Sequence, residues 1–189
     1  TVNWLDGLDG LAGGVTVIAC VVLFINGVYR IEPPQYSVAL LPIALMGATL
    51  GFLPFNLSPA RIFLGSSGAY FLGFALGSLS IIGGAKMASI LLVMGLPLLD
   101  VGWQIITRIR RGQNPVQGDR GHLHFRLLDL GLSQRQIVLG YYVFCAVFGL
   151  LALFIPSRLY KLIAILVMVG ISMVGFRWLS RRPPSDTPP

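Results

Sequence analysis

The sequence predicts an all-α fold, a bundle of about six transmembrane helices, and this prediction rests on composition and hydropathy. Of the 189 residues, 55% are hydrophobic and only 11% are charged, whereas a soluble domain carries about 25% charged residues. The mean hydropathy is +0.79, and the apolar residues fall into long runs. One soluble core cannot hide so much apolar sequence, so a water-soluble enzyme, a disordered chain and a disulfide scaffold are excluded.

Six apolar runs are long enough to span a bilayer as helices. Each approaches the roughly 20 residues that a helix needs to cross about 30 Å of hydrocarbon. The runs are too long and too continuously apolar for barrel strands, so helices are expected. The expected spans are residues 11–29, 37–53, 67–84, 87–106, 136–155 and 162–179.

Gly-Gly pairs, Pro-Pro pairs and charged residues separate these runs, and no internal repeat is present. We expect residues 1–180 to form one membrane domain, and residues 181–189 to be a disordered tail because they are too polar and proline-rich to pack. The chain begins with Thr1 rather than Met, which suggests a fragment. Cys20 and Cys145 both lie inside apolar runs, so they are expected to be core residues.

The distribution of basic residues predicts the orientation in the membrane. Six spans place both chain ends on the same side as loops 54–66 and 107–135. The opposite side holds only Arg30, Lys86, Arg158 and Lys161. By the positive-inside rule the arginine-rich side is cytoplasmic, so we expect a plasma-membrane protein with its polar loops in the cytoplasm. The net charge is +7, but the basic residues lie between apolar runs, as membrane-flanking residues do. Nucleic acid is therefore not an expected partner. The arginines of the expected cytoplasmic side are Arg61, Arg108, Arg110, Arg111, Arg120, Arg126, Arg135, Arg177, Arg181 and Arg182.

The first polar motif comes directly before the first span. Asp6 and Asp9 are three residues apart, so they would share one face of a helix, and glycines follow each of them. Paired acids at a membrane boundary can hold Mg²⁺, orient a nucleotide or transfer protons. The alternative is helix capping by an aspartate in a glycine-rich turn.

The second motif, residues 54–70, contains Asn56 and the segment Gly65-Ser66-Ser67-Gly68 just before the third span. Two glycines that bracket two serines at the start of a helix suit an anion. A plain helix cap is at least as good an explanation, because such a short segment is not specific.

The third motif, residues 114–128, contains both histidines of the chain, His122 and His124, flanked by Arg120 and Arg126. Guanidinium groups match phosphate oxygens, so this set suits a diphosphate. A basic membrane-surface loop would explain the arginines, but not the concentration of histidines. Asp100 lies inside the fourth span, where an ionisable residue is a functional candidate because its burial is costly. The alternative role for Asp100 is a structural partner of a nearby arginine or of Trp103.

Together these motifs resemble the polyprenyl-phosphate N-acetylhexosamine-1-phosphate transferases, integral membrane enzymes that start bacterial cell-wall and surface-polysaccharide synthesis. The family motif N-x-x-D-G-x-D-G-L matches residues 3–11, and P-x-x-D matches residues 97–100. The pattern P-F-N-x-x-P-A-[RK]-I-F-x-G-D-[SA]-G matches residues 54–68 except at Ser66, and D-R-x-H-L-H-H-R-L-L matches residues 119–128 except at Phe125.

The resemblance implies a reaction between two anions. A polyprenyl-phosphate oxygen attacks the sugar-linked phosphorus of a UDP-N-acetylhexosamine, and UMP is released. The resemblance assigns catalytic roles to Asp6, Asp9, His122, His124 and Arg126, and substrate contacts to Asn3, Asn56, Asp100 and Arg120. It also implies Mg²⁺, with Mn²⁺ as an alternative, undecaprenyl or decaprenyl phosphate as the lipid, and a homodimer as a candidate assembly. The H-L-H-x-R form favours N-acetylglucosamine over the muramoyl-pentapeptide.

Ser66 and Phe125 are the two departures from the family pattern, and Ser66 leads to a competing hypothesis. Ser66 stands where the family has a metal-binding aspartate, and serine is a much poorer ligand for a hard cation. The chain also starts where the second half of the family begins, so we expect residues 1–180 to be a C-terminal half that is inactive alone. The alternative is an impaired paralogue that binds lipid phosphate or nucleotide. A transporter would show broken helices or repeated halves, and the sequence shows neither.

Overall fold

The computed structural model describes residues 2–31, 33–82, 87–110, 112, 122–155 and 157–180. Within these residues the chain is helical and has no strand, so the predicted all-α class is confirmed. The helices in chain order are α1 (Val2–Leu5), α2 (Leu11–Ile25), the π-helical turn η1 (Asn26–Arg30), α3 (Tyr36–Asn56), α4 (Gly65–Ile82), α5 (Met87–Val93), α6 (Gly95–Arg110), α7 (Leu123–Asp129), α8 (Gln134–Phe154) and α9 (Arg158–Ser180).

Five of the described helices are long and apolar enough to cross a membrane: α2 with η1, α3, α4, α8 and most of α9. The pair α5 and α6 makes a sixth span if the two are counted together. The predicted bundle of about six transmembrane helices is therefore confirmed. The short helices α1 and α7 were not predicted, because neither is long enough to show an apolar period.

The expected continuous span 87–106 is wrong. It is broken at Met94 into α5 and α6, which are bent by 74°. Pro97 has no N–H to donate to the carbonyl of Val93, and Gly95 directly follows Met94. The helix therefore kinks at Met94. The sequence analysis argued against a transporter because it found neither broken helices nor repeated halves. The break between α5 and α6 removes the first of these two arguments.

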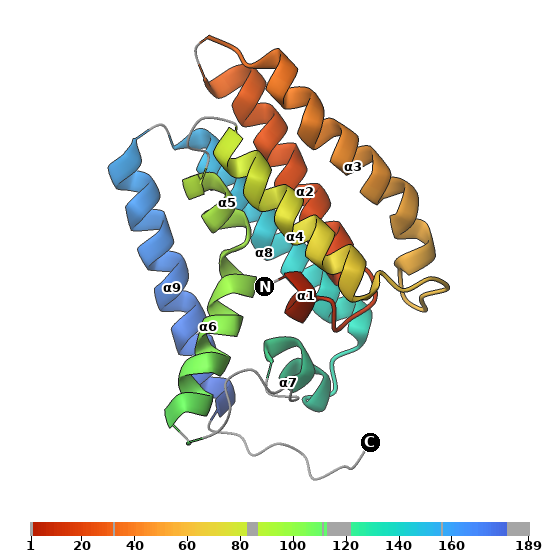
Figure 1. The fold of residues 1–189 in the computed structure, drawn as a ribbon. Helices are drawn as coiled ribbons and strands as arrows, with labels where there is room; N and C mark the ends of the chain where they lie inside the picture. The colour runs from red at the N-terminus through yellow and green to blue at the C-terminus, as the bar shows by residue number, and fades with distance from the viewer. Residues whose placement is uncertain are drawn as a thin grey trace.

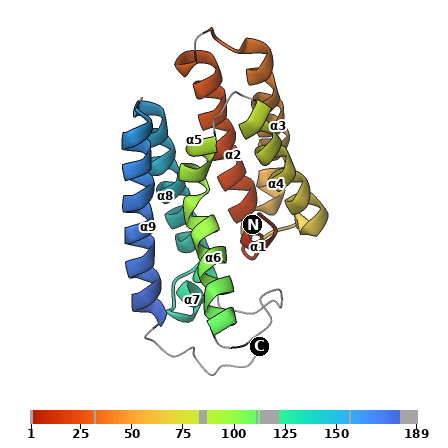
Figure 2. The ribbon, with the colours of Figure 1, turned by 60° about the vertical axis from the view of Figure 1, so that its left-hand side comes forward.

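Helix α2 is the centre of the bundle. Leu11, Val15, Ala19 and Cys20 of this helix are fully buried, and α2 packs against α3, α4, α5 and α8. Figures 1 and 2 show α3 and α9 on the periphery. Their windows of highest hydropathy are only 17% and 22% buried, against 67% for α2. Apolar outer faces of this kind fit contact with lipid. Cys20 and Cys145 are both buried free thiols, as expected.

The connections of the bundle separate into two ends. The turn before α2, the loop between α3 and α4, and helix α7 lie at the lower end in Figure 1, and the α2–α3 and α8–α9 connections lie at the upper end. The α3–α4 loop and the described residues 122–133 of the expected loop 107–135 therefore lie at the same end, whereas residues 111 and 113–121 of that loop lie outside the described residues. Which side faces the cytoplasm stays a prediction, and the expected tail 181–189 lies outside the described residues.

Candidate active site

The two aspartates of the first motif lie in a turn, here called the acidic loop (residues 6–10), between α1 and α2. The expectation that they share a helical face is wrong. Gly10, the residue that caps α2, has φ = 79°, a left-handed conformation that favours glycine and breaks the helical path before Leu11. The aspartates are nevertheless close enough for the charge of Asp9 to affect Asp6.

Two side chains hold Gly10 from both sides. Its N–H donates to Oδ1 of Asn56 over 3.1 Å, and its carbonyl accepts from the Tyr142 hydroxyl over 2.6 Å. Asn56 also donates from Nδ2 to the carbonyl of Ile62 over 3.0 Å. Asn56, predicted as a substrate contact, therefore joins the acidic loop to the α3–α4 loop.

Each carboxylate of the acidic loop accepts from a backbone N–H of the segment that leads from α3 into the first residue of α4. Oδ2 of Asp9 accepts from the N–H of Ala60 over 3.1 Å, and Asp6 accepts from the N–H of Gly65. Burial raises the pKa of Asp6 to about 6, the Gly65 N–H opposes this, and the charge of Asp9 adds to it. Partial burial and a like charge together make Asp6 more readily protonated than an ordinary carboxyl group.

The loop between α3 and α4 is itself fixed by its neighbours. The N–H groups of Arg61 and Ile62 both donate to the carbonyl of Phe55, which closes a tight turn. The Arg135 guanidinium on α8 donates to the carbonyl of Ser58, with Nη2 at 2.9 Å. Arg135 was read from the sequence only as flanking charge, and Tyr142 was not singled out at all. One polar atom in an apolar run leaves no sequence signal that could have found Tyr142.

Ser66 lies in the first turn of α4 and is exposed. The helix starts at Gly65, so the serines lie within α4 rather than before it. Ser66 directly follows Gly65, whose N–H binds Asp6. No group of three or more His, Cys, Asp or Glu side chains that could hold a metal is found among the described residues. Two carboxylates still fit Mg²⁺, which usually takes one or two of them and completes its shell with water and substrate phosphates.

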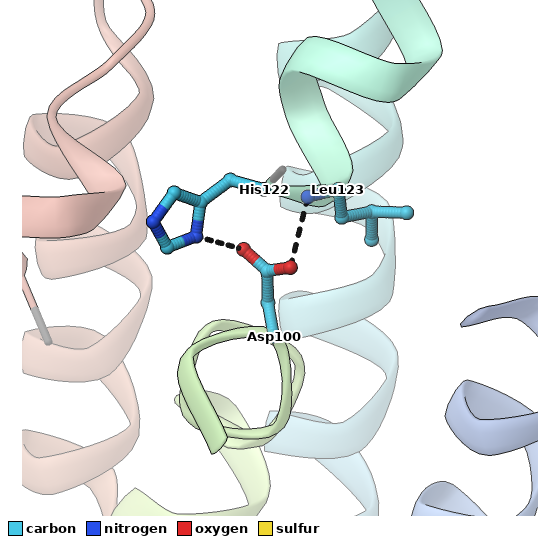
Figure 3. A network of polar contacts seen from close by, with 3 residues as sticks. All are labelled: Asp100, His122 and Leu123. Carbon is cyan, nitrogen blue, oxygen red and sulfur yellow. Dashed lines mark hydrogen bonds and ion pairs between the residues drawn. The ribbon is translucent and has the colours of Figure 1, made fainter. Parts of the chain in front are cut away.

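Asp100 and His122 form a buried pair at the point where α6 lies beside the start of α7. Nδ1 of His122 lies 2.9 Å from Oδ2 of Asp100, and the N–H of Leu123 donates to Oδ1 over 2.8 Å, as Figure 3 shows. The exposed fractions of Asp100 and His122 are 4% and 7%. Asp100 was predicted as a substrate contact, and in the structure both of its oxygens bind the third motif.

His124 is the most deeply buried titratable residue of the motif, with 0% exposure. Neither of its ring nitrogens has a hydrogen-bond partner in the described part of the chain. Its Nε2 lies against Gly7, where a Cβ would overlap the ring, so glycine is required between Asp6 and Asp9. Burial lowers the pKa of His124 to about 4, Asp100 opposes this shift, and His122 adds to it. His124 is therefore a neutral imidazole at physiological pH.

The remaining predicted site residues differ in how far the structure describes them. Arg126 is half-buried in α7, one turn after His122, and Asn3 is half-buried in α1. Arg120 lies outside the described residues. The structure thus brings Asp6, Asp9 and Asn56 together, joins Asp100 to His122, and places His124 against the acidic loop.

Helix α6 carries a polar face that the sequence analysis missed. Asp100, Gln104 and Arg108 are 4%, 4% and 5% exposed, and their spacing of four residues places them in one row. Arg108 was interpreted as flanking charge on a loop, yet it is buried. The spacing from Asp100 could have shown this. The ring of Trp4 in α1 lies near His122, with 6.3 Å between centroids.

Comparison with known proteins adds two kinds of similarity. Residues 1–84 match the model of a family described as Glycosyl transferase family 4. The chain is 35% identical over 162 residues to a probable undecaprenyl-phosphate N-acetylglucosaminyl 1-phosphate transferase of Bacillus subtilis, with 82% of this chain and 44% of that protein covered.

Two further relatives have related names. The chain is 32% identical over 207 residues to a decaprenyl-phosphate N-acetylglucosaminephosphotransferase of Mycolicibacterium smegmatis, which covers 96% of this chain and 51% of that protein. It is 33% identical over 162 residues to a phospho-N-acetylmuramoyl-pentapeptide-transferase of Chlamydia trachomatis, with 82% and 47% covered. The chain therefore spans about half the length of the curated relatives that it matches.

Proposed function

Because this chain belongs to glycosyl transferase family 4, we propose that it supplies part of the active site of a multi-pass membrane enzyme that transfers an N-acetylhexosamine 1-phosphate group to polyprenyl phosphate. The donor is a UDP-N-acetylhexosamine, and UMP is the second product. In this step a phosphate oxygen of the lipid bonds to the sugar-linked phosphorus of the donor. The bond from that phosphorus to the oxygen bridging it to UMP breaks, and UMP keeps the electron pair.

One observation carries the proposal. The acidic loop lies in contact with the histidine motif, the name used here for residues 122–128, at one end of the bundle, although the two are more than a hundred residues apart in sequence. His124 lies against Gly7, between the two aspartates. Carboxylates beside imidazoles at the end of apolar helices suit a reaction between a phosphate held in the membrane and a nucleotide in water. Two anions repel, so charge neutralisation and positioning are the main requirements of such a site.

The site residues divide into two proposed roles. Asp6 and Asp9 belong to the nucleotide and catalytic centre, with Asn3 nearby in the sequence. Asn56 holds the acidic loop, and the second hydrogen of its amide is proposed to reach the nucleotide. His122, His124 and Arg126, with Arg120, are proposed to bind the diphosphate, because imidazole and guanidinium donors match phosphate oxygens.

Mg²⁺, or Mn²⁺ in its place, is the proposed cofactor, and Asp6 and Asp9 are the residues that would hold it. Bound there, it would supply positive charge for the phosphate oxygens. Burial and the charge of Asp9 raise the pKa of Asp6 to about 6, and a cation held between the two carboxylates would oppose that shift.

N-Acetylglucosamine 1-phosphate is the proposed group transferred. The names of two of the relatives described above specify N-acetylglucosamine, and their lipids are undecaprenyl and decaprenyl phosphate. Transfer of this group would be the first membrane step of cell-wall or surface-polysaccharide synthesis. We place the acidic loop and α7 in the cytoplasm, on the arginine-rich side. A membrane-impermeant thiol reagent should then label Tyr36→Cys, but not Leu132→Cys, in intact cells.

The test is UMP release by membranes that contain the complete protein, supplied with undecaprenyl phosphate and either UDP-N-acetylglucosamine or the UDP-muramoyl-pentapeptide. Release with the first donor alone is the expected result. Release with neither donor would overturn the proposal and favour the second candidate, an impaired paralogue that binds lipid phosphate or nucleotide. The observation behind that candidate is Ser66, which offers no carboxylate where α4 meets Asp6. Binding of UDP-N-acetylglucosamine without turnover would identify it.

A further inference from the structure

Asp100 binds the histidine motif through both of its carboxylate oxygens. Oδ2 pairs with Nδ1 of His122 at 2.9 Å, and Oδ1 accepts from the N–H of Leu123 at 2.8 Å. An ionised carboxylate accepts hydrogen bonds and donates none. With Asp100 as an anion, the proton in the first contact belongs to Nδ1 of His122, and the second contact occupies the remaining oxygen.

This contact determines which nitrogen of His122 is presented to the rest of the site. With the proton on Nδ1 and that atom bound to Asp100, Nε2 is the nitrogen available to a ligand. In Figure 3 the ring edge opposite Asp100 points toward the pale red ribbon of the N-terminal segment. The ring of Trp4, from that segment, lies 6.3 Å from the His122 ring between centroids.

The same two bonds also set the start of α7. Leu123 is the first residue of that helix, and a carboxylate on its N–H satisfies one of the donors that a helix start leaves open. The rings of His122 and His124 are stacked at 5.6 Å with an angle of 7° between their planes. A shift of His122 would therefore also move its neighbour against Gly7.

We propose that Asp100 is a positioning residue: it fixes the tautomer of His122 and the start of α7, so that Nε2 of His122 faces the N-terminal segment that carries Trp4. Asp100 then acts through His122 rather than by touching the substrate. Its importance for activity rests on the proposed transferase reaction, whereas its effect on the His122 ring does not.

Asp100→Asn separates this role from a merely structural one. The amide oxygen can still accept from the Leu123 N–H, so α7 keeps its start. The amide nitrogen now faces Nδ1 of His122 as a donor, which favours the tautomer with its proton on Nε2. Partners that orient a histidine typically contribute about 10- to 100-fold to the function of that histidine, so kcat should fall by about that factor with a small change in KM.

Two measurements test the proposal. The first is ¹⁵N NMR of the histidine rings in the complete, detergent-solubilised protein, with His122→Gln and His124→Gln used to assign the two rings. The proton of wild-type His122 should lie on Nδ1, and in Asp100→Asn it should move to Nε2. A wild-type ring that carries its proton only on Nε2 would overturn the proposal even if every Asp100 variant fails to fold.

The second measurement is a double-mutant cycle on UMP release with Asp100→Asn, His122→Gln and the double variant. If Asp100 acts through His122, Asp100→Asn should cost nothing further in the His122→Gln background. Losses that multiply would show that Asp100 acts independently and would overturn the proposal. Thr49→Val, which removes a hydroxyl that bonds to the carbonyl of Leu45 in the same helix, is the control and should retain activity. An inactive wild type with the expected NMR pattern would contradict the transferase reaction and leave the His122 orientation standing.

Discussion

The acidic loop and the histidine motif meet in the structure, but they are held in different ways. The acidic loop is held through its backbone and carboxylates by groups from α3, the α3–α4 connection and α8, among them Asn56, Ala60 and Tyr142. In the described part of the histidine motif, the carboxylate of Asp100 binds both His122 and the N–H of Leu123, and the two histidine rings are buried. Because Asp100 binds two groups of the second region at once, its loss should matter more than the loss of one of the separate hydrogen bonds that hold the first.

The two regions also respond to acid in opposite directions. Burial raises the pKa of Asp6 and lowers that of His124. Both shifts favour the neutral form, as expected when a group leaves water without a full set of partners. At neutral pH His124 therefore adds no positive charge to the site, which leaves the charge of arriving phosphates to be met by the arginines and by a cation.

The largest expected effect comes from removing the reactive group of each region in turn. Asp6→Asn and His122→Gln should each lower kcat for UMP release by about 100-fold or more, because each removes a group that meets phosphate charge or holds the cation. Thermal unfolding in detergent should change little, since Asn and Gln keep most of the volume and hydrogen-bonding capacity. A loss confined to one variant would show that only that region carries chemistry.

The next effect is a dependence of stability on pH that belongs to His124. Its pKa is about 4 in the folded protein and 6.5 when unperturbed. At pH above 6.5 both states are neutral and this contribution is fully present. As pH falls from 6.5 to 4 the unfolded state gains a proton that the folded state does not, and about 3 kcal/mol of stability is lost.

His124→Phe checks this prediction, because it keeps a ring in the buried site and removes the titration. The difference in thermal stability between wild type and His124→Phe should grow in favour of the variant as pH falls from 7 to 4. Asp6 acts in the opposite direction, since its raised pKa favours folding as pH falls through about 6, and it is common to both proteins. Parallel pH profiles would contradict the burial of a neutral His124.

A smaller effect is expected from the two side chains that hold Gly10. Asn56→Ala leaves the Gly10 N–H and the Ile62 carbonyl without partners and should cost about 2 kcal/mol, whereas Tyr142→Phe removes one hydrogen bond and should cost about 1 kcal/mol. Thermal unfolding measures both. Thr49→Val on the same helix is the control, because the Thr49 hydroxyl bonds only to the carbonyl of Leu45 one turn away. Equal losses for Asn56→Ala and Thr49→Val would show that the loop does not depend on Asn56.

The smallest effect is expected at Ser66. A gain in Mg²⁺ affinity there would support the proposal that the acidic loop holds a cation. Ser66→Asp places a third carboxylate at the exposed start of α4, beside the residue that binds Asp6. The Mg²⁺ concentration for half-maximal UMP release should fall by about tenfold, since one further anionic oxygen ligand favours a hard cation. Ser67→Asp, one residue along the same turn, is the control. An equal Mg²⁺ dependence in wild type and Ser66→Asp would contradict a metal position at Ser66.

Some of the site could be read from the sequence because its residues carry a local signal. Asp6, Asp9, His122 and His124 stand out since ionisable residues are rare in so apolar a chain. Asp100 stands out because it interrupts a span. The partners of these residues could not be read in the same way. Nothing in the sequence pairs Asp100 with His122 rather than with an arginine or Trp103, because the two are 22 residues apart and meet only when α7 packs against α6.

The sequence by itself determined the class of the protein: apolar runs of bilayer length can satisfy their backbone only as helices, so six of them make a membrane bundle. It also determined which residues were candidates for chemistry. Tertiary structure alone decided that Asn56 and Tyr142 hold Gly10, that α6 buries Gln104 and Arg108, and that a 74° bend breaks the fourth span. The physical reason is that helix formation depends on local composition, whereas a hydrogen bond between distant side chains depends on how the helices pack.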